Sequence, residues 1–178
     1  IGLGSALAFL AVMSYIASAI PAMLAIGYAY TQASAIFAVG GIMGIVGSFI
    51  FGIIDQKIGT KKASVIYGIF AIIMLIMCLL MPLGKIMVWI ACIGMVGGMG
   101  GIYNLLISIN LQIFGRWDFV ATNRFVGFVQ ALLVSSSFAI NAIFMNTSLG
   151  YNGLYVFLLI LAIISLIIMI RTNDTMVG

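Results

Sequence analysis

The chain has very few charged residues. Only 6% of its 178 residues are Asp, Glu, Lys or Arg, histidine is absent, and 65% of the residues are hydrophobic. A water-soluble domain carries roughly a quarter charged residues, so this chain cannot cover a water-facing surface with polar groups. The composition excludes a soluble globular fold and intrinsic disorder, and it indicates a protein of the lipid bilayer.

The same scarcity removes several kinds of chemistry. Without histidine the usual zinc and haem ligand sets are missing, and Cys78 and Cys92 lie inside apolar runs, where we expect buried thiols and no disulfide. No charged residue lies near the middle of an apolar run, so the usual general bases of an enzyme and the acids of a proton relay are absent. The sequence predicts no enzyme, no cofactor, no metal and no nucleic-acid partner.

Long apolar stretches predict an all-α membrane protein, a single six-helix transmembrane bundle over residues 1–178. Each stretch is long enough to cross a hydrocarbon core of roughly 30 Å as a helix, and a helix satisfies its own backbone hydrogen bonds in lipid. The short loops between them favour antiparallel packing of neighbours. The stretches cover about residues 3–28, 33–54, 63–81, 86–109, 125–144 and 154–170.

Basic residues predict the orientation in the membrane. One side of the bundle holds only Lys85, and the loops after the second and fourth stretches, with the C-terminal end, hold the other six. Because cytoplasmic loops carry an excess of Lys and Arg, we expect an integral protein of the cell membrane with both chain ends in the cytoplasm. The six cytoplasmic residues are Lys57, Lys61, Lys62, Arg116, Arg124 and Arg171.

Glycines form two faces at helical spacing, one on the second stretch and one on the fourth. Small residues at this spacing let helix backbones approach closely in lipid. Close packing is the simpler interpretation, and faces that slide during transport are the alternative that the sequence leaves open. The glycines are Gly40, Gly44 and Gly47, then Gly94, Gly98 and Gly101.

Neutral polar side chains lie within the apolar stretches, where they either line a hydrated cavity or bond across helices. For Ser14 and Ser18 we favour helix packing, because a serine can bond back to its own helix. For the amides both roles stay open, since an amide in lipid needs several partners. The remaining groups of this kind are Tyr15, Tyr103, Asn104, Ser108, Gln130, Ser137 and Asn141.

The loop from Asp55 to Lys62, with the sequence DQKIGTKK, resembles a signature of the major facilitator superfamily. In that family the signature follows the second helix of each six-helix half, as it does here. Gly59 permits a tight turn, and Asp55 can bond helix N-terminal amides and a nearby cation. Two details depart from the family: Gly59 follows Asp55 by four residues instead of three, and Phe51 stands where a glycine is usual.

A second segment, from Phe114 to Phe119, has the sequence FGRWDF. It is similar to a stretch between the tenth and eleventh helices of such transporters, clearest in the oxalate/formate and monocarboxylate antiporter-like branches. The resemblance implies the C-terminal six-helix half, helices seven to twelve, of a twelve-helix fold whose N-terminal half is missing. Because the chain begins with Ile1, not Met, almost at the start of an apolar run, we interpret it as a fragment without its natural start.

The resemblance also implies a function: half of a secondary-active transporter that moves a small solute, organic anions included, by alternating access. Helices one and four of each half line the cavity in this family, and helices two and five form the interface between halves. The cavity candidates are then Ser14, Tyr15, Tyr103, Asn104, Ser108, Gln130, Ser137 and Asn141, the last three near the interface or the cavity edge. The cytoplasmic gate comprises Asp55, Gly59, Lys61, Lys62, Arg116 and Arg124, with an ion pair expected from Asp55 to Arg116 or Arg124.

An alternative function fits the same length and number of spans. The chain could be a complete six-span solute-binding subunit of a multi-component uptake system, which docks on an energising complex. Its co-purification with an ATPase complex would favour that alternative.

Overall fold

The structure is a computed structural model, and it describes residues 2–115 and 119–171. The described residues form six long helices and one short 3-10 helix, with no strand among them, and each long helix is long and apolar enough to cross a membrane. The predicted all-α class with six apolar helices is therefore confirmed. The elements are α1 (Gly2–Ala25), α2 (Tyr30–Ile58), α3 (Thr60–Leu79), η1 (Met81–Leu83), α4 (Lys85–Phe114), α5 (Phe119–Met145) and α6 (Gly150–Arg171).

Glycines, rather than the limits of the apolar stretches, set several helix ends. Helix α2 continues through the polar residues after Ile54 until Gly59, whose φ of 86° suits glycine and whose N–H donates to the Asp55 carbonyl at 2.9 Å. Helix α4 likewise extends to Gly115, at φ 69°. The helices are thus longer at these ends than the hydropathy pattern alone indicates.

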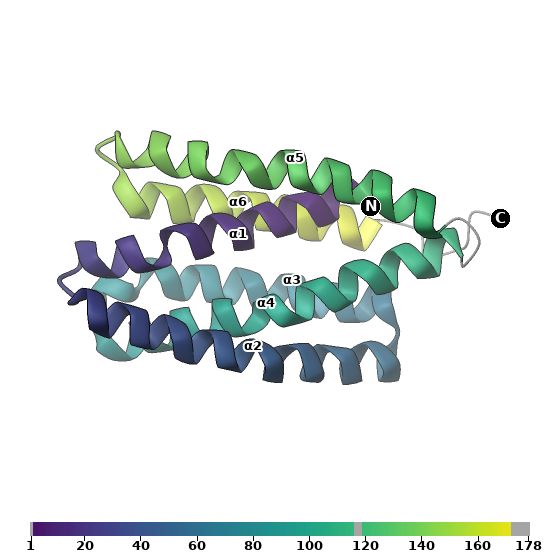
Figure 1. The fold of residues 1–178 in the computed structure, drawn as a ribbon, viewed down its shortest axis with the longest axis horizontal. Helices are drawn as coiled ribbons and strands as arrows, with labels where there is room; N and C mark the ends of the chain where they lie inside the picture. Colours follow the sequence, from purple (N-terminus) through teal and green to yellow (C-terminus); the bar gives the residue numbers. More distant parts are fainter. Residues whose placement is uncertain (1, 116–118, 172–178) are drawn as a thin grey trace.

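The helices are arranged in two layers of three (Figure 1). In one layer α1 packs against α5 and α6, and in the other α4 packs against α2 and α3. The most extensive helix contacts are α2 with α4 and α1 with α5, and α3 and α6 join the layers. Helices α1 and α4 therefore form the centre of the bundle.

The arrangement is unchanged when the first three helices are exchanged with the last three. The exchange turns the α2–α4 contact into α5–α1, α3–α4 into α6–α1, and α2–α3 into α5–α6, and each member of a pair is observed. Helices α1 and α4 run in opposite directions (Figure 1), so the exchange inverts the chain relative to the membrane. The bundle has the architecture of an inverted repeat of three helices.

The two ends of the bundle differ in charge. We call one end the Lys85 end; it carries the α1–α2, α3–α4 and α5–α6 connections (Figure 1). The opposite end, the Lys61 end, carries the turn at Gly59, the start of α1 and the end of α6. The only acidic residue among the described ones, Asp55, lies in the last turn of α2 at the Lys61 end.

The centre of the bundle is a buried cluster where α1, α3, α4 and α6 meet. The rings of Tyr15 and Tyr155, each 1% exposed, lie 6.0 Å apart between centroids. Cys78 and Cys92 are buried beside them and free, as expected from the sequence, and the Tyr15 hydroxyl contacts both thiols.

Helices α2 and α4 approach so closely that their backbones touch. A methyl group at Gly47 would collide with the Gly97 carbonyl, and one at Gly100 would collide with the Gly44 carbonyl. The glycines Gly94 and Gly98, by contrast, pack against side chains of α3. The α2 glycines that meet α4 were predicted to pack closely. Gly97 and Gly100 of α4 were not, although their spacing is also helical.

We predict that Gly47→Ala lowers the free energy of unfolding by about 1–3 kcal/mol, as over-packing does. The added methyl meets a backbone carbonyl, which cannot rotate away. The matched control is Gly41→Ala on the same helix, where nothing lies within 4 Å of the new carbon. Steric trapping in bicelles measures both free energies, and equal stability of the two variants would contradict the close contact.

Candidate functional site

A groove of about 840 Å³ lies between α2 and α4, and lining residues such as Ile45 and Phe49 are exposed. Most of its lining is apolar or glycine, and its polar groups come from Ser48, Gln56, Tyr103 and Asn104. Among the described residues, no cationic or acidic side chain lines it. A concave, mostly apolar surface with a few convergent polar groups is the usual form of a small-molecule site.

Asn104 ties the two walls of the groove together. Its Nδ2 donates to the main-chain oxygen of Ser48 at 3.0 Å and to the Ser48 Oγ at 2.7 Å. These bonds use only the donor side of the amide. Asn104 therefore forms a hydrogen bond between α2 and α4, and it also lines the groove.

Tyr103 lies at the rim of the groove and is 44% exposed. Its ring meets the edge of Phe9 on α1, with centroids 5.0 Å apart and planes at 81°. This contact fixes the ring while its surface stays accessible. Ser108, one turn further along α4, is half-buried and is not part of the groove lining.

Two amide candidates of α5 bond across the contact between α1 and α5. Asn141 Nδ2 donates to the Ser14 main-chain oxygen at 3.0 Å, and Gln130 Nε2 donates to the Ser5 Oγ at 3.3 Å. Ser14, Tyr15 and Ser137 are at most 1% exposed, and the groove does not include them. The eight candidates therefore do not form one site, and of them Tyr103 and Asn104 line the groove.

Ser18 bonds back to its own helix, as the sequence analysis favoured. Its Oγ donates to the Tyr15 carbonyl at 3.0 Å. The Ser14 Oγ is buried without a hydrogen-bond partner among the described residues. Both serines lie inside the bundle rather than at a surface.

The expected gate residues gather at the Lys61 end. Asp55 and Lys61 are half-buried, Lys62 and Arg124 are exposed, and Gly59 makes the turn between α2 and α3. Arg116 lies outside the described residues, and so does any pair that it forms with Asp55. The pairing of Asp55 with Arg124 stays a prediction.

Two groove residues, Ser48 and Gln56, were not among the sequence candidates. Ser48 follows Gly47 and faces α4 because the glycines draw the two helices together. Gln56 was interpreted as part of the loop, but it lies in the last turns of α2. The sequence feature that could have identified Ser48 is its position next to Gly47, on the glycine face of α2.

Comparison with known proteins found no family model, no curated protein and no solved structure that matches this chain. Within the described residues, no three His, Cys, Asp or Glu side chains gather as a metal site requires. Any functional assignment therefore depends on the helix arrangement and on the groove.

We predict that Asn104→Leu lowers the free energy of unfolding by about 0.6 kcal/mol and by no more than about 1.7, the range for interhelical hydrogen bonds in membranes. Ser135→Ala is the control, because Ser135 is exposed and bonds only to its own helix, at the Ala131 carbonyl. A double-mutant cycle with Ser48→Ala measures the share of the bond to Oγ. Zero coupling in that cycle would contradict the bond from Asn104 to the Ser48 Oγ.

Proposed function

We propose that this chain is one half of a secondary-active transporter, which moves a small solute by alternating access. In its finer form, the proposal makes the chain the C-terminal six-helix half of a twelve-helix fold of the major facilitator type. The second half would cover the open side of the α2–α4 groove. The solute would bind between the halves.

The exchange symmetry of the bundle is the observation that carries the proposal. Transporters of this type are built from inverted repeats, and each six-helix half contains two repeats of three helices. In such folds the solute site lies near the middle of the bilayer, at an interface between repeats. Here the groove lies between α2 of the first three-helix unit and α4 of the second.

The polar lining of the groove supports a covered site. Ser48 and Asn104 lie well inside helices that are long and apolar enough to span a membrane, and polar groups at that depth face a bundle interior or a water-filled cavity. Because lining residues such as Ile45 and Phe49 are exposed, a second helical unit is needed to exclude lipid from the groove. Because the lining is neutral, it suits a small solute that both donates and accepts hydrogen bonds. The charge of an organic anion would be balanced by the second half.

The charged residues of the Lys61 end fit the role of a reversible latch. Exposed ion pairs are worth about 0–1 kcal/mol, so pairs formed by Asp55 and the cations near it would break readily. A latch that opens once in each transport cycle has to be weak. The positive-inside pattern places this latch on the cytoplasmic side.

The first test asks whether water reaches the groove, and it needs no knowledge of the solute. In the complete native gene product, with every natural cysteine replaced by alanine, Tyr103→Cys is alkylated with a membrane-impermeant maleimide. We expect at least tenfold faster labelling than for Ile42→Cys, because thiols ionise and react in water.

Ile42 is the matched control, since it is 66% exposed on α2 outside the groove lining. Labelling from either side of the membrane indicates alternating access, and equally slow labelling at both positions would refute the proposal.

The second test compares the chain with its complete gene product in vesicles. Uptake of a panel of radiolabelled small carboxylates and neutral polar solutes is expected with the complete product. No uptake is expected with these 178 residues alone, because half of the cavity wall is then missing. Uptake by the 178-residue chain alone would show that it is not a half.

A further inference from the structure

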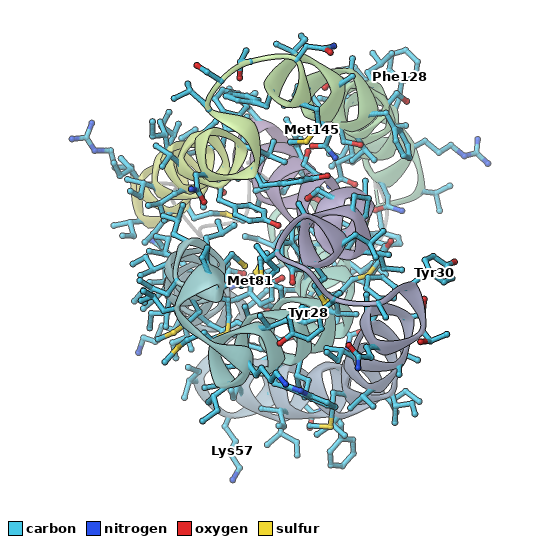
Figure 2. The ribbon with its side chains drawn as sticks, turned by 90° about the vertical axis from the view of Figure 1, so that its left-hand side faces the viewer. Tyr28, Tyr30, Lys57, Met81, Phe128 and Met145 are labelled. Carbon is cyan, nitrogen blue, oxygen red and sulfur yellow. The ribbon has the colours of Figure 1, made fainter. Side chains whose placement is uncertain are left out.

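Two small cavities adjoin at the Lys85 end, with volumes of about 270 and 290 Å³. They share Tyr28, Gln32 and Lys85, and lie where the α1–α2 turn meets the start of α4. We call this site the Lys85 junction. Figure 2 looks onto this end and shows Tyr28 near the middle of the bundle, close to Met81.

The electrostatics of the Lys85 junction favour an anion. Helices α2 and α4 both begin here, and neither N-cap residue, Ala29 or Gly84, makes a side-chain capping bond. Helix N-termini carry partial positive charge and free N–H groups, and the Lys85 ammonium adds a full charge. Among the described residues the only acid, Asp55, lies at the far end of α2.

Two hydrogen-bond donors line both cavities. The side chains of Gln32 and Lys85 are exposed there, so an anion in the cavities would accept from the Gln32 amide and from the Lys85 ammonium. Tyr28 forms part of the wall of both cavities, and its hydroxyl oxygen is buried.

The second cavity extends from these polar groups along an apolar surface. Its other lining residues are Ala35, Ile36 and Trp89, and Trp89 is 42% exposed. Tryptophan at the end of a membrane helix lies at the level of lipid head groups. The Lys85 junction is therefore polar at the end of the bundle and apolar towards the membrane interior.

We propose that the Lys85 junction binds the anionic head group, a phosphate or carboxylate, of a membrane amphiphile. The acyl chain lies along Ala35, Ile36 and Trp89, and the head group meets Lys85 and Gln32. A zwitterionic phosphatidylcholine is disfavoured because its choline brings a cation to a positively charged site. The proposal is independent of transport and of which side of the membrane the Lys85 end faces.

Quenching of Trp89 fluorescence tests the proposal. The chain has two tryptophans, so Trp117→Phe leaves Trp89 as the single reporter. The protein in neutral detergent is titrated with phosphatidylglycerol or phosphatidylcholine, each brominated on its acyl chains. We expect half-maximal quenching at about fivefold lower phosphatidylglycerol, since one basic residue near an anionic lipid surface contributes about 1 kcal/mol.

Two pairs of variants locate the site. Lys85→Gln should abolish the fivefold preference, whereas Lys57→Gln, with the same charge change at an exposed residue of the other end, should preserve it. Gln32→Leu should weaken phosphatidylglycerol binding about threefold through the loss of one hydrogen bond. Gln56→Leu is its control, because Gln56 is exposed near the other end of the same helix.

Three results would overturn the proposal. The first is equal quenching by both lipids in the parent protein. The second is an equal effect of Lys57→Gln and Lys85→Gln, which would indicate general charge attraction. The third is full displacement of the brominated lipid by millimolar inorganic phosphate, which would assign the site to a soluble anion. None of these results bears on water access to Tyr103, so failure here is distinguishable from failure of the proposed transport.

Discussion

A bilayer offers no hydrogen bonds to a protein, and the whole structure follows from that constraint. The backbone satisfies itself in six helices, and the amide side chains must find partners on neighbouring helices. Asn104 bonds to Ser48, Asn141 to Ser14, and Gln130 to Ser5. All three bonds lie in the two most extensive helix contacts, α2–α4 and α1–α5. The polar residues of the spans therefore hold together the pairs of helices on which the bundle depends.

Exchanging the two three-helix units turns the α2–α4 contact into the α1–α5 contact. The residues that form these two contacts nevertheless differ. The α2–α4 contact has glycines on both helices, and backbone meets backbone at Gly47 and Gly100. Helix α5 contributes only Gly127, where an added methyl would meet nothing within 4 Å. The 840 Å³ groove accompanies the glycine-rich contact. The candidate site is thus a local departure from an otherwise symmetric arrangement.

Hydropathy was sufficient to predict the six helices, because a chain this apolar has few other ways to satisfy its backbone in lipid. It could not predict which helices pair. Helical spacing shows that Ser14 and Tyr15 share a region of α1, but not that α5 and α6 bury it. The same limit explains Gly97 and Ser48, whose positions matter only because α2 lies against α4. Tyr103 and Asn104 were singled out as polar residues within an apolar stretch, and both line the groove, but a role for them in solute binding stays a prediction.

The groove and the Lys85 junction occupy different depths along the same pair of helices. Between them, Gly40 of α2 packs on Val96 of α4, with only 2.9 Å from an added methyl at Gly40 to the Val96 Cβ. A contact this tight leaves no space for a ligand to pass between α2 and α4, and packed protein interiors resist continuous deformation. If this bundle alternates its access, the movement is therefore expected between the bundle and a second unit rather than within the α2–α4 contact. A lipid at the Lys85 junction would then act on a rigid body, at the end opposite to the proposed latch.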